Sequence, residues 1–123
     1  MLRLIFSNLP VSLARLKDRI VPGVAVIFRN NIAGACGVEV TEPEIYFVDT
    51  RWATLSINCE LRTNVMIHVL AEWHRWDQEV KRKVAEAIYD FLLILNLDVT
   101  SDIVFQDLAS NSFFFEGRPV PDV

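Results

Sequence analysis

The chain has 123 residues, of which 52% are hydrophobic, and its formal net charge is −4, with lysine and arginine scattered along its length. This length and apolar content fit one domain, residues 1–123, around one hydrophobic core. Scattered basic residues argue against nucleic acid as a partner, and the lack of a long apolar run argues against a signal peptide or a membrane span. We therefore expect a cytoplasmic protein that binds neither nucleic acid nor membrane.

The cysteines and the hydropathy bear on redox state and assembly. Cys36 and Cys59 are the two cysteines, and a single bridge is not typical of a disulfide-dependent fold with this much apolar material, so we expect reduced thiols. A mean hydropathy of +0.29 with 11% aromatic residues exceeds what one small core usually hides. This excess predicts an oligomer.

The first half of the chain predicts a strand, a helix and a second strand. Residues 2–6 alternate as a strand does, and a turn follows them. Between residues 13 and 32, apolar side chains recur at three- and four-residue steps, which predicts a helix. A proline removes a backbone donor in this run, so we expect a kink or restart near residues 20–22. The β preference of residues 24–28 leaves a buried strand as the alternative there.

The middle of the chain is less regular. Gly34 and Gly37 are expected to end the helix, and residues 43–48 predict the next strand. The segment 51–62 is ambiguous, because its partial alternation fits either an extension of that strand or one arm of a hairpin.

The second half begins with a strand, residues 65–72, that is apolar on both faces. One face is formed by Val65, Ile67, Val69 and Ala71. Since Met66 and Leu70 make the other face largely apolar too, a strand of this kind needs cover on both sides.

The longest helix is predicted from Asp77, its N-cap, to Leu95, with an apolar stripe on one side and charged residues opposite. Residues 103–108 then form the last core strand. Residues 113–115 indicate a short terminal strand or hairpin.

A short pattern occurs twice along the chain. Val40-Thr41, followed by Ile-Tyr-Phe-Val-Asp at 45–49, returns as Val99-Thr100, followed by Ile-Val-Phe-Gln-Asp at 103–107. Each copy closes a strand–helix–strand segment, so the simplest explanation is a duplicated βαβ unit. We place the two halves at about 1–50 and 64–108.

The predicted fold is α/β (α+β), a four-stranded mixed sheet with two helices on one face. Two helices cover only one face of such a sheet, and apolar surface left wet costs ~25 cal/mol per Å². A second subunit is therefore expected on the other face. Residues 113–115 are expected either in that contact or in the protomer's own core.

This order of elements resembles the tautomerase superfamily, the group of macrophage migration inhibitory factor (MIF) and oxalocrotonate tautomerase. The segments 64–72, 77–95 and 103–108 carry the resemblance, with an echo in 4–49, and only 51–63 lies outside it. Within the group the chain looks most like a family of small bacterial proteins of unknown function. The resemblance implies a homotrimer. A ferredoxin-like duplication is the alternative.

The resemblance also implies a chemistry that this sequence only partly supports. In that group an N-terminal proline, exposed by loss of the initiator methionine, acts as general base on an enol or keto acid. Here the second residue is Leu2, whose bulk disfavours removal of Met1, so the amine of Met1 is the inherited candidate base. Arg51 and Arg75, near strand ends, are the candidate contacts for a substrate carboxylate.

Other combinations of reactive side chains are weaker. His68 and His74 fall on a strand and in the turn after it, which does not suit a metal site, so we expect no metal and no cofactor. A thiol nucleophile, Cys59 with His68 as its base, is conceivable, although nothing in the sequence sets their distance. The simpler interpretation has His68 on the sheet surface or at a subunit contact.

Two functions are compatible with these features of the sequence. The first is a tautomerase-like enzyme of altered or lost activity that would isomerise a small keto or enol carboxylic acid. The alternative is a non-catalytic trimer that binds a small ligand or a protein. A regulatory interaction domain with a ferredoxin-like fold would instead be a dimer.

Overall fold

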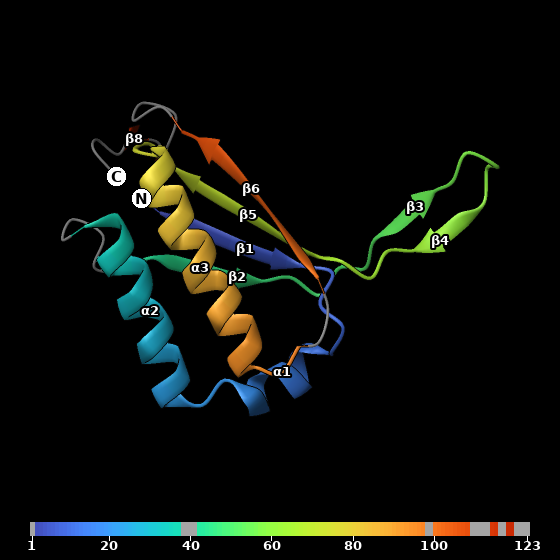
Figure 1. Ribbon diagram of the computed structural model, residues 1–123, viewed down its shortest axis with the longest axis horizontal. Helices are drawn as coiled ribbons and strands as arrows, with labels where there is room; N and C mark the ends of the chain where they lie inside the picture. The colour runs from blue at the N-terminus through green and yellow to red at the C-terminus, as the bar shows by residue number, and fades with distance from the viewer. Residues whose placement is uncertain (1, 38–41, 98–99, 109–113, 116–117, 120–123) are drawn as a thin grey trace.

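A computed structural model describes residues 2–37, 42–97, 100–108, 114–115 and 118–119. The main sheet contains β1 (Arg3–Ser7), β2 (Glu44–Phe47), β5 (Ile67–Trp73) and β6 (Ser101–Asp107), in the order β2-β1-β5-β6 (Figure 1). Its central pair, β1 and β5, is antiparallel, and both outer pairs are parallel. The predicted four-stranded mixed sheet is confirmed.

Helices connect the strands of each parallel pair. The helices α1 (Leu13–Arg19) and α2 (Pro22–Cys36) lie between β1 and β2, and α3 (Gln78–Ile94) lies between β5 and β6. Both parallel pairs place an isoleucine of the repeated pattern on their helix-covered side: Ile45 is beside Leu4, and Ile103 is beside Val69. Val40, Thr41 and Val99 of that pattern lie outside the described residues.

The helix boundaries follow local signals. The predicted restart is confirmed, because α1 ends at Arg19 and α2 begins at Pro22, whose missing donor costs nothing in a first turn. Residues 24–28 lie inside α2, so the strand alternative was wrong. The helix ends with Gly37 at φ 102°, a conformation that glycine adopts easily. Gly34 does not end it and lies within it.

The longest helix begins as expected. The Asp77 carboxylate accepts a hydrogen bond from the Val80 backbone N–H at 2.9 Å. Its apolar stripe packs against the sheet, with Val84, Ile88 and Phe91 at most 3% exposed. The predicted amphipathic helix is therefore confirmed.

The core lies between the helices and one face of the sheet. On that face the strands contribute Leu4, Phe6, Ile67, Val69, Ala71 and Trp73, all buried. Phe28 of α2 and Phe91 of α3 stack with ring centroids 3.9 Å apart, and Phe6 meets both rings edge-on. The buried aromatic rings join both helices to the central strand.

The other face of the sheet, named here the open face, is not covered by any helix that the structure describes (Figure 1). Strand alternation and register place three rows of side chains across it. The charged row is Glu44, Arg3, Glu72 and Gln106; the apolar row is Tyr46, Ile5, Leu70 and Val104; the polar row is Ser7, His68 and Asp102. The sequence predicted apolar residues over both faces of the sheet. On the open face, the residues of these strands are apolar only in the middle row.

A two-stranded hairpin projects away from the sheet (Figure 1). It consists of β3 (Ala53–Leu55) and β4 (Leu61–Thr63), paired antiparallel, and we name residues 53–63 the arm. Of the two interpretations of segment 51–62, the hairpin is therefore correct. Ile57 in its turn is 97% exposed.

Val65 does not belong to the strand that follows the arm. Its side chain is 70% exposed, and β5 begins only at Ile67. The reason lies in Asn8, whose side-chain amide donates to the carbonyls of Asn64 and Met66 at 2.7 Å each. These bonds hold residues 64–66 outside the ladder, with a bend at Met66, so this part of the strand prediction was wrong.

The chain ends in a short hairpin, β7 (Phe114–Phe115) with β8 (Arg118–Pro119), as predicted for a terminal strand or hairpin. The third residue of the phenylalanine run, Phe113, lies outside the described residues. Across the described part of the chain, none of the helices combines the length and the apolar character that crossing a bilayer requires.

Candidate functional site

The polar row of the open face brings together a serine, a histidine and an aspartate. Ser7 on β1 lies directly opposite His68 on β5, and His68 lies beside Asp102 on β6. These strands are neighbours in the sheet (Figure 1), so the imidazole stands between the hydroxyl and the carboxylate. All three side chains share one face because strand residues alternate between faces.

The hydrogen bond between His68 and Asp102 defines which ring nitrogen carries the proton in the neutral imidazole. His68 Nδ1 lies 2.8 Å from Asp102 Oδ1. A carboxylate only accepts hydrogen bonds, so Nδ1 is the donor, and in the neutral ring the lone pair lies on Nε2. Among the described residues Nε2 has no hydrogen-bond partner, although it is buried. A buried, unengaged basic nitrogen is unusual and points to a functional role.

Trp52 covers this histidine. Its ring centroid lies 5.0 Å from that of His68, and its indole N–H donates to Ser7 Oγ at 3.2 Å. The Trp52 backbone N–H in turn donates to Asn8 Oδ1 at 2.9 Å. Asn8 is 3% exposed and has φ 57°, a left-handed conformation that asparagine tolerates better than most residues. Asn8 therefore fixes Trp52 over the dyad.

A cavity of about 430 Å³ opens above the polar row. It is lined by Ile5, Ser7, Val48, Thr50, Trp52, His68, Val69, Leu70, Asp102 and Val104. We name it the His68 pocket. A mostly apolar wall with a few converging polar groups is the usual composition of a small-molecule site.

The predicted site residues occupy different ends of the sheet. Arg51 is exposed and lies between Thr50 and Trp52, both of which line the His68 pocket. Arg75 is exposed beyond the opposite end of β5. The fold thus separates the two arginines within a protomer. Met1 lies outside the described residues.

At the sheet end next to the amino terminus, charged and polar side chains of neighbouring strands pair with one another. Leu2 is 2% exposed. Arg3 contacts Glu44 at 3.3 Å and Glu72 at 3.6 Å. The Tyr46 hydroxyl donates to Glu44 at 3.0 Å, and this hydrogen bond, followed by the glutamate's charge, raises the pKa of Tyr46. The guanidinium of Arg3 is thus already engaged by two carboxylates.

The other combinations of reactive side chains, Cys59 with His68 and His68 with His74, do not lie together in the fold. Cys59 is exposed in the turn of the arm, which projects away from the main sheet (Figure 1). His68 and His74 lie at opposite ends of β5. Within the described ranges, no group of three or more histidine, cysteine, aspartate or glutamate side chains has metal-binding geometry.

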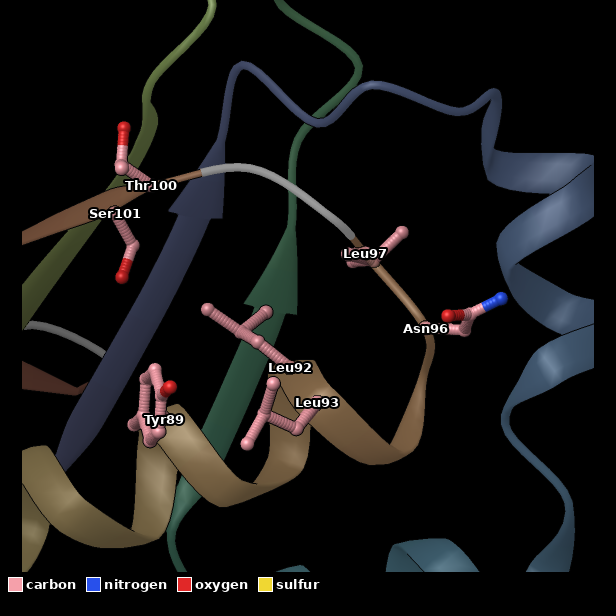
Figure 2. A pocket seen from close by; sticks show the side chains of 7 residues that line it. All are labelled: Tyr89, Leu92, Leu93, Asn96, Leu97, Thr100 and Ser101. Atoms are coloured by element: carbon pink, nitrogen blue, oxygen red, sulfur yellow. The ribbon is translucent and has the colours of Figure 1, made fainter.

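A second cavity, of about 590 Å³, lies at the carboxyl end of α3 (Figure 2). It is lined by Tyr89, Leu92, Leu93, Asn96, Leu97, Thr100 and Ser101. Among the described residues of this lining there is no histidine, carboxylate, lysine or arginine, so they offer no group suited to proton transfer near neutral pH. The His68 pocket is the stronger candidate site.

The sequence did not reveal the dyad because its members are far apart along the chain. His68 and Asp102 are separated by 34 residues. A usable signal existed in the repeat: aligning Ile103 with Val69, as Ile45 aligns with Leu4, places Asp102 beside His68.

No family model matches this sequence, and no curated protein does. Solved structures nevertheless share its fold. A domain of unknown function from Sebaldella termitidis has a TM-score of 0.67 at 14% identity, over 95% of this chain and 97% of that one. Native fused 4-OT has a TM-score of 0.66 at 10% identity, over 95% and 94%. Macrophage migration inhibitory factor from Toxoplasma gondii has 0.61 at 10% identity, over 94% and 97%.

These likenesses lie in the fold, because the identities are low. They confirm the predicted tautomerase-type fold, with its mixed four-stranded sheet and helices. They do not transfer an activity, and the residues of this chain decide what its site does.

Proposed function

We propose that this protein moves a proton between carbon and oxygen of a small keto or enol acid, with His68 as the general base. The observation that carries the proposal is that Nε2 of His68 has no hydrogen-bond partner among the described residues. Asp102, 2.8 Å from Nδ1, favours the tautomer that has its proton on Nδ1 and its lone pair on Nε2. A histidine oriented by a carboxylate is a common arrangement for acid–base catalysis.

The fold neighbours support the substrate class. One is described as inactivated by 2-oxo-3-pentynoate, and another is a malonate semialdehyde decarboxylase inhibited by 3-bromopropiolate. Both compounds are small carboxylates. In this chain Arg51, next to the pocket, is the cation that we propose for the substrate carboxylate.

The reaction uses few groups. With the acid in the His68 pocket, Nε2 removes a proton from the carbon next to the carbonyl, and the electron pair of that C–H bond forms the enolate. Asp102 stabilises the imidazolium that results. The imidazolium then returns the proton to the oxygen, which gives the enol. Since Trp52 lies against the imidazole, its ring has to shift to admit the substrate.

The amine of Met1 is the rival base that the family resemblance implies. Leu2 is buried, and the nearby Arg3 is engaged by Glu44 and Glu72. Of the residues described at this sheet end, Arg3 is therefore not free to form the cation-lined pocket that would favour an anionic substrate and a neutral amine. The geometry favours His68.

The test is hydrogen–deuterium exchange at C3 of phenylpyruvate, followed by NMR. We expect His68→Asn to lose about 100-fold or more of the exchange rate, as removal of a general base does. Asp102→Asn should also lose it, because an amide can donate to Nδ1 and so place the ring proton on Nε2.

Two controls accompany this test. His74→Asn, at the other end of β5, should keep the wild-type rate, and so should N-terminal acetylation. Exchange that survives His68→Asn but is lost on acetylation would assign the reaction to Met1. Binding of phenylpyruvate without any exchange would leave a non-catalytic ligand-binding protein.

We also propose that the protein assembles as a homotrimer through its open face, with the whole chain acting as one domain of two βαβ halves. The apolar row supports this, since Val104 is 57% exposed and Tyr46 is 47% exposed in the single protomer. Two neighbours are described as asymmetric trimers of fused 4-OT. The neighbours thus support self-association, and the open face is the surface proposed for it.

A further inference from the structure

We propose that Ser7, His68 and Asp102 form a nucleophilic triad, so that the protein also cleaves small acyl esters through an acyl-serine intermediate. The proposal rests on the same dyad as the proposed function, but it adds a different nucleophile and a different reaction. It comes from the order of the three side chains across β1, β5 and β6.

The register places the hydroxyl within reach of the histidine. Ser7 and His68 are direct partners on antiparallel strands, where opposite Cβ atoms lie about 4.5–5.5 Å apart. Asp102 occupies the other side of the imidazole and holds Nδ1, so the free lone pair of Nε2 is the one available to Ser7. This is the chain of roles in a serine triad: a carboxylate orients the base, and the base faces a hydroxyl.

The hydrogen bonds of Ser7 leave its proton available. Ser7 Oγ accepts from the Trp52 indole N–H at 3.2 Å. Within the described part of the chain, the Ser7 hydroxyl proton has no hydrogen-bond acceptor, and on the neighbouring strand His68 Nε2 is a buried acceptor without a donor. Rotation about the Cα–Cβ bond of Ser7 would join these two groups.

The chemistry balances with water as the co-reactant. Ser7 Oγ attacks the acyl carbon while its proton passes to His68 Nε2. The bond from that carbon to the alcohol oxygen breaks, and the alcohol leaves with the proton from the imidazolium. Water, deprotonated by Nε2, then attacks the acyl-serine. The bond from the acyl carbon to Ser7 Oγ breaks, Oγ takes the proton back from the imidazolium, and the acid is released. The indole N–H of Trp52 donates to Ser7 Oγ in the free protein, and once the ring has shifted to admit the ester we assign this donor to the developing oxyanion.

The pocket indicates the size and polarity of the acyl group. Ile5, Val48, Leu70 and Val104 form an apolar wall of a cavity of about 430 Å³. Short, uncharged acyl chains such as acetyl or butyryl fit a wall of this kind.

The experiment uses a fluorophosphonate probe, which reacts with activated serines, followed by intact mass measurement and tryptic mapping of the labelled protein. We expect one adduct per chain, on Ser7 within the peptide 4–15. Ser7→Ala should lose the adduct, and His68→Asn should slow labelling at least about 100-fold. Hydrolysis of p-nitrophenyl butyrate should fall in the same two variants.

Ser12 provides a matched control, because it lies in the same tryptic peptide and only caps α1. Ser12→Ala should keep the adduct. An unlabelled wild-type protein, an adduct on Ser12, or labelling of Ser7→Ala at the wild-type rate would each overturn the proposal. Circular dichroism and thermal unfolding establish that the variants are folded.

This experiment separates the two proposals. Labelling of Ser7 in wild-type protein that does not exchange deuterium into phenylpyruvate would refute only the proton-transfer function. Deuterium exchange in wild-type protein that the probe does not label would refute only the triad.

Discussion

At the scale of single residues, the open face depends on side chains that hold one another in place. Asp102 selects the tautomer of His68, and Glu44 fixes the hydroxyl of Tyr46. Each carboxylate accepts a hydrogen bond from its neighbour, so each controls where that neighbour carries a proton. The first pair lies in the polar row, whereas the second joins the charged and apolar rows, so the two can be tested separately.

The Tyr46 pair predicts a pH effect whose sign follows from its cause. Glu44 raises the pKa of Tyr46 in the folded state, so the contact stabilises the fold at lower pH, and this contribution is lost as the pH rises through the raised pKa. We expect Glu44→Gln to lower the pKa of Tyr46 toward its ordinary value. Phenolate absorbance in a Tyr89→Phe background, which leaves Tyr46 as the only tyrosine, measures it.

Glu42→Gln is the control for this titration, because it removes the charge of a glutamate two residues from Glu44, and the Tyr46 hydroxyl donates to Glu44. It should leave the midpoint close to that of the wild-type side chain. An unchanged midpoint in Glu44→Gln would show that Glu44 does not control the proton of Tyr46.

At the scale of elements, the arm depends for its stability on contacts with the rest of the chain. A two-stranded hairpin is at best marginally stable in water, and Leu55 and Leu61 are 67% and 76% exposed. What anchors its base is Asn8, which bonds the Asn64 and Met66 carbonyls and the Trp52 N–H. One buried asparagine thus joins the first strand to both ends of the arm.

Replacing Asn8 with alanine should cost about 2–4 kcal/mol of unfolding free energy, because buried backbone groups lose their partners and alanine disfavours the positive φ. Urea unfolding measures the total, and hydrogen exchange of the Trp52 amide reports on the arm itself. Asn8→Gly keeps the backbone conformation unstrained and still loses the hydrogen bonds, so it separates the two causes. A loss below about 0.5 kcal/mol would contradict this role for Asn8.

At the scale of the whole molecule, the two faces of the sheet differ in how they are kept from water. Helices cover the face that carries Leu4, Phe6 and Val69, whereas the apolar row of the other face is left exposed by the described chain. Exposed apolar rows flanked by polar ones are typical of interfaces. The proposed trimer would cover this row and enclose the His68 pocket beside it.

Val104→Glu tests the proposed interface, since it places a charge in the apolar row at its exposed β6 end. Size-exclusion chromatography with light scattering should show a trimer for the wild type and a lower mass for the variant. Leu93→Glu, at a comparably exposed position on α3, should leave the trimer intact. A wild-type monomer, or a Val104→Glu protein that stays trimeric, would refute association through the open face.

The sequence by itself determined the features that depend on near neighbours. The Asp77 cap, the restart at Pro22, the apolar stripe of α3 and the alternation of β5 follow from steric and hydrogen-bonding preferences within a few residues, and all are found in the structure. The repeated pattern also predicted two βαβ units, and each corresponds to one of the parallel strand pairs.

Only the tertiary structure decided which side chains meet. The site joins Ser7, His68 and Asp102 across three strands, and each meeting depends on register, where a slip of one residue would turn a side chain to the other face. The placement of Val65 outside the ladder likewise depends on hydrogen bonds from the distant Asn8. Local preference cannot encode such contacts, because their free energy arises only when strands far apart in the chain pack together.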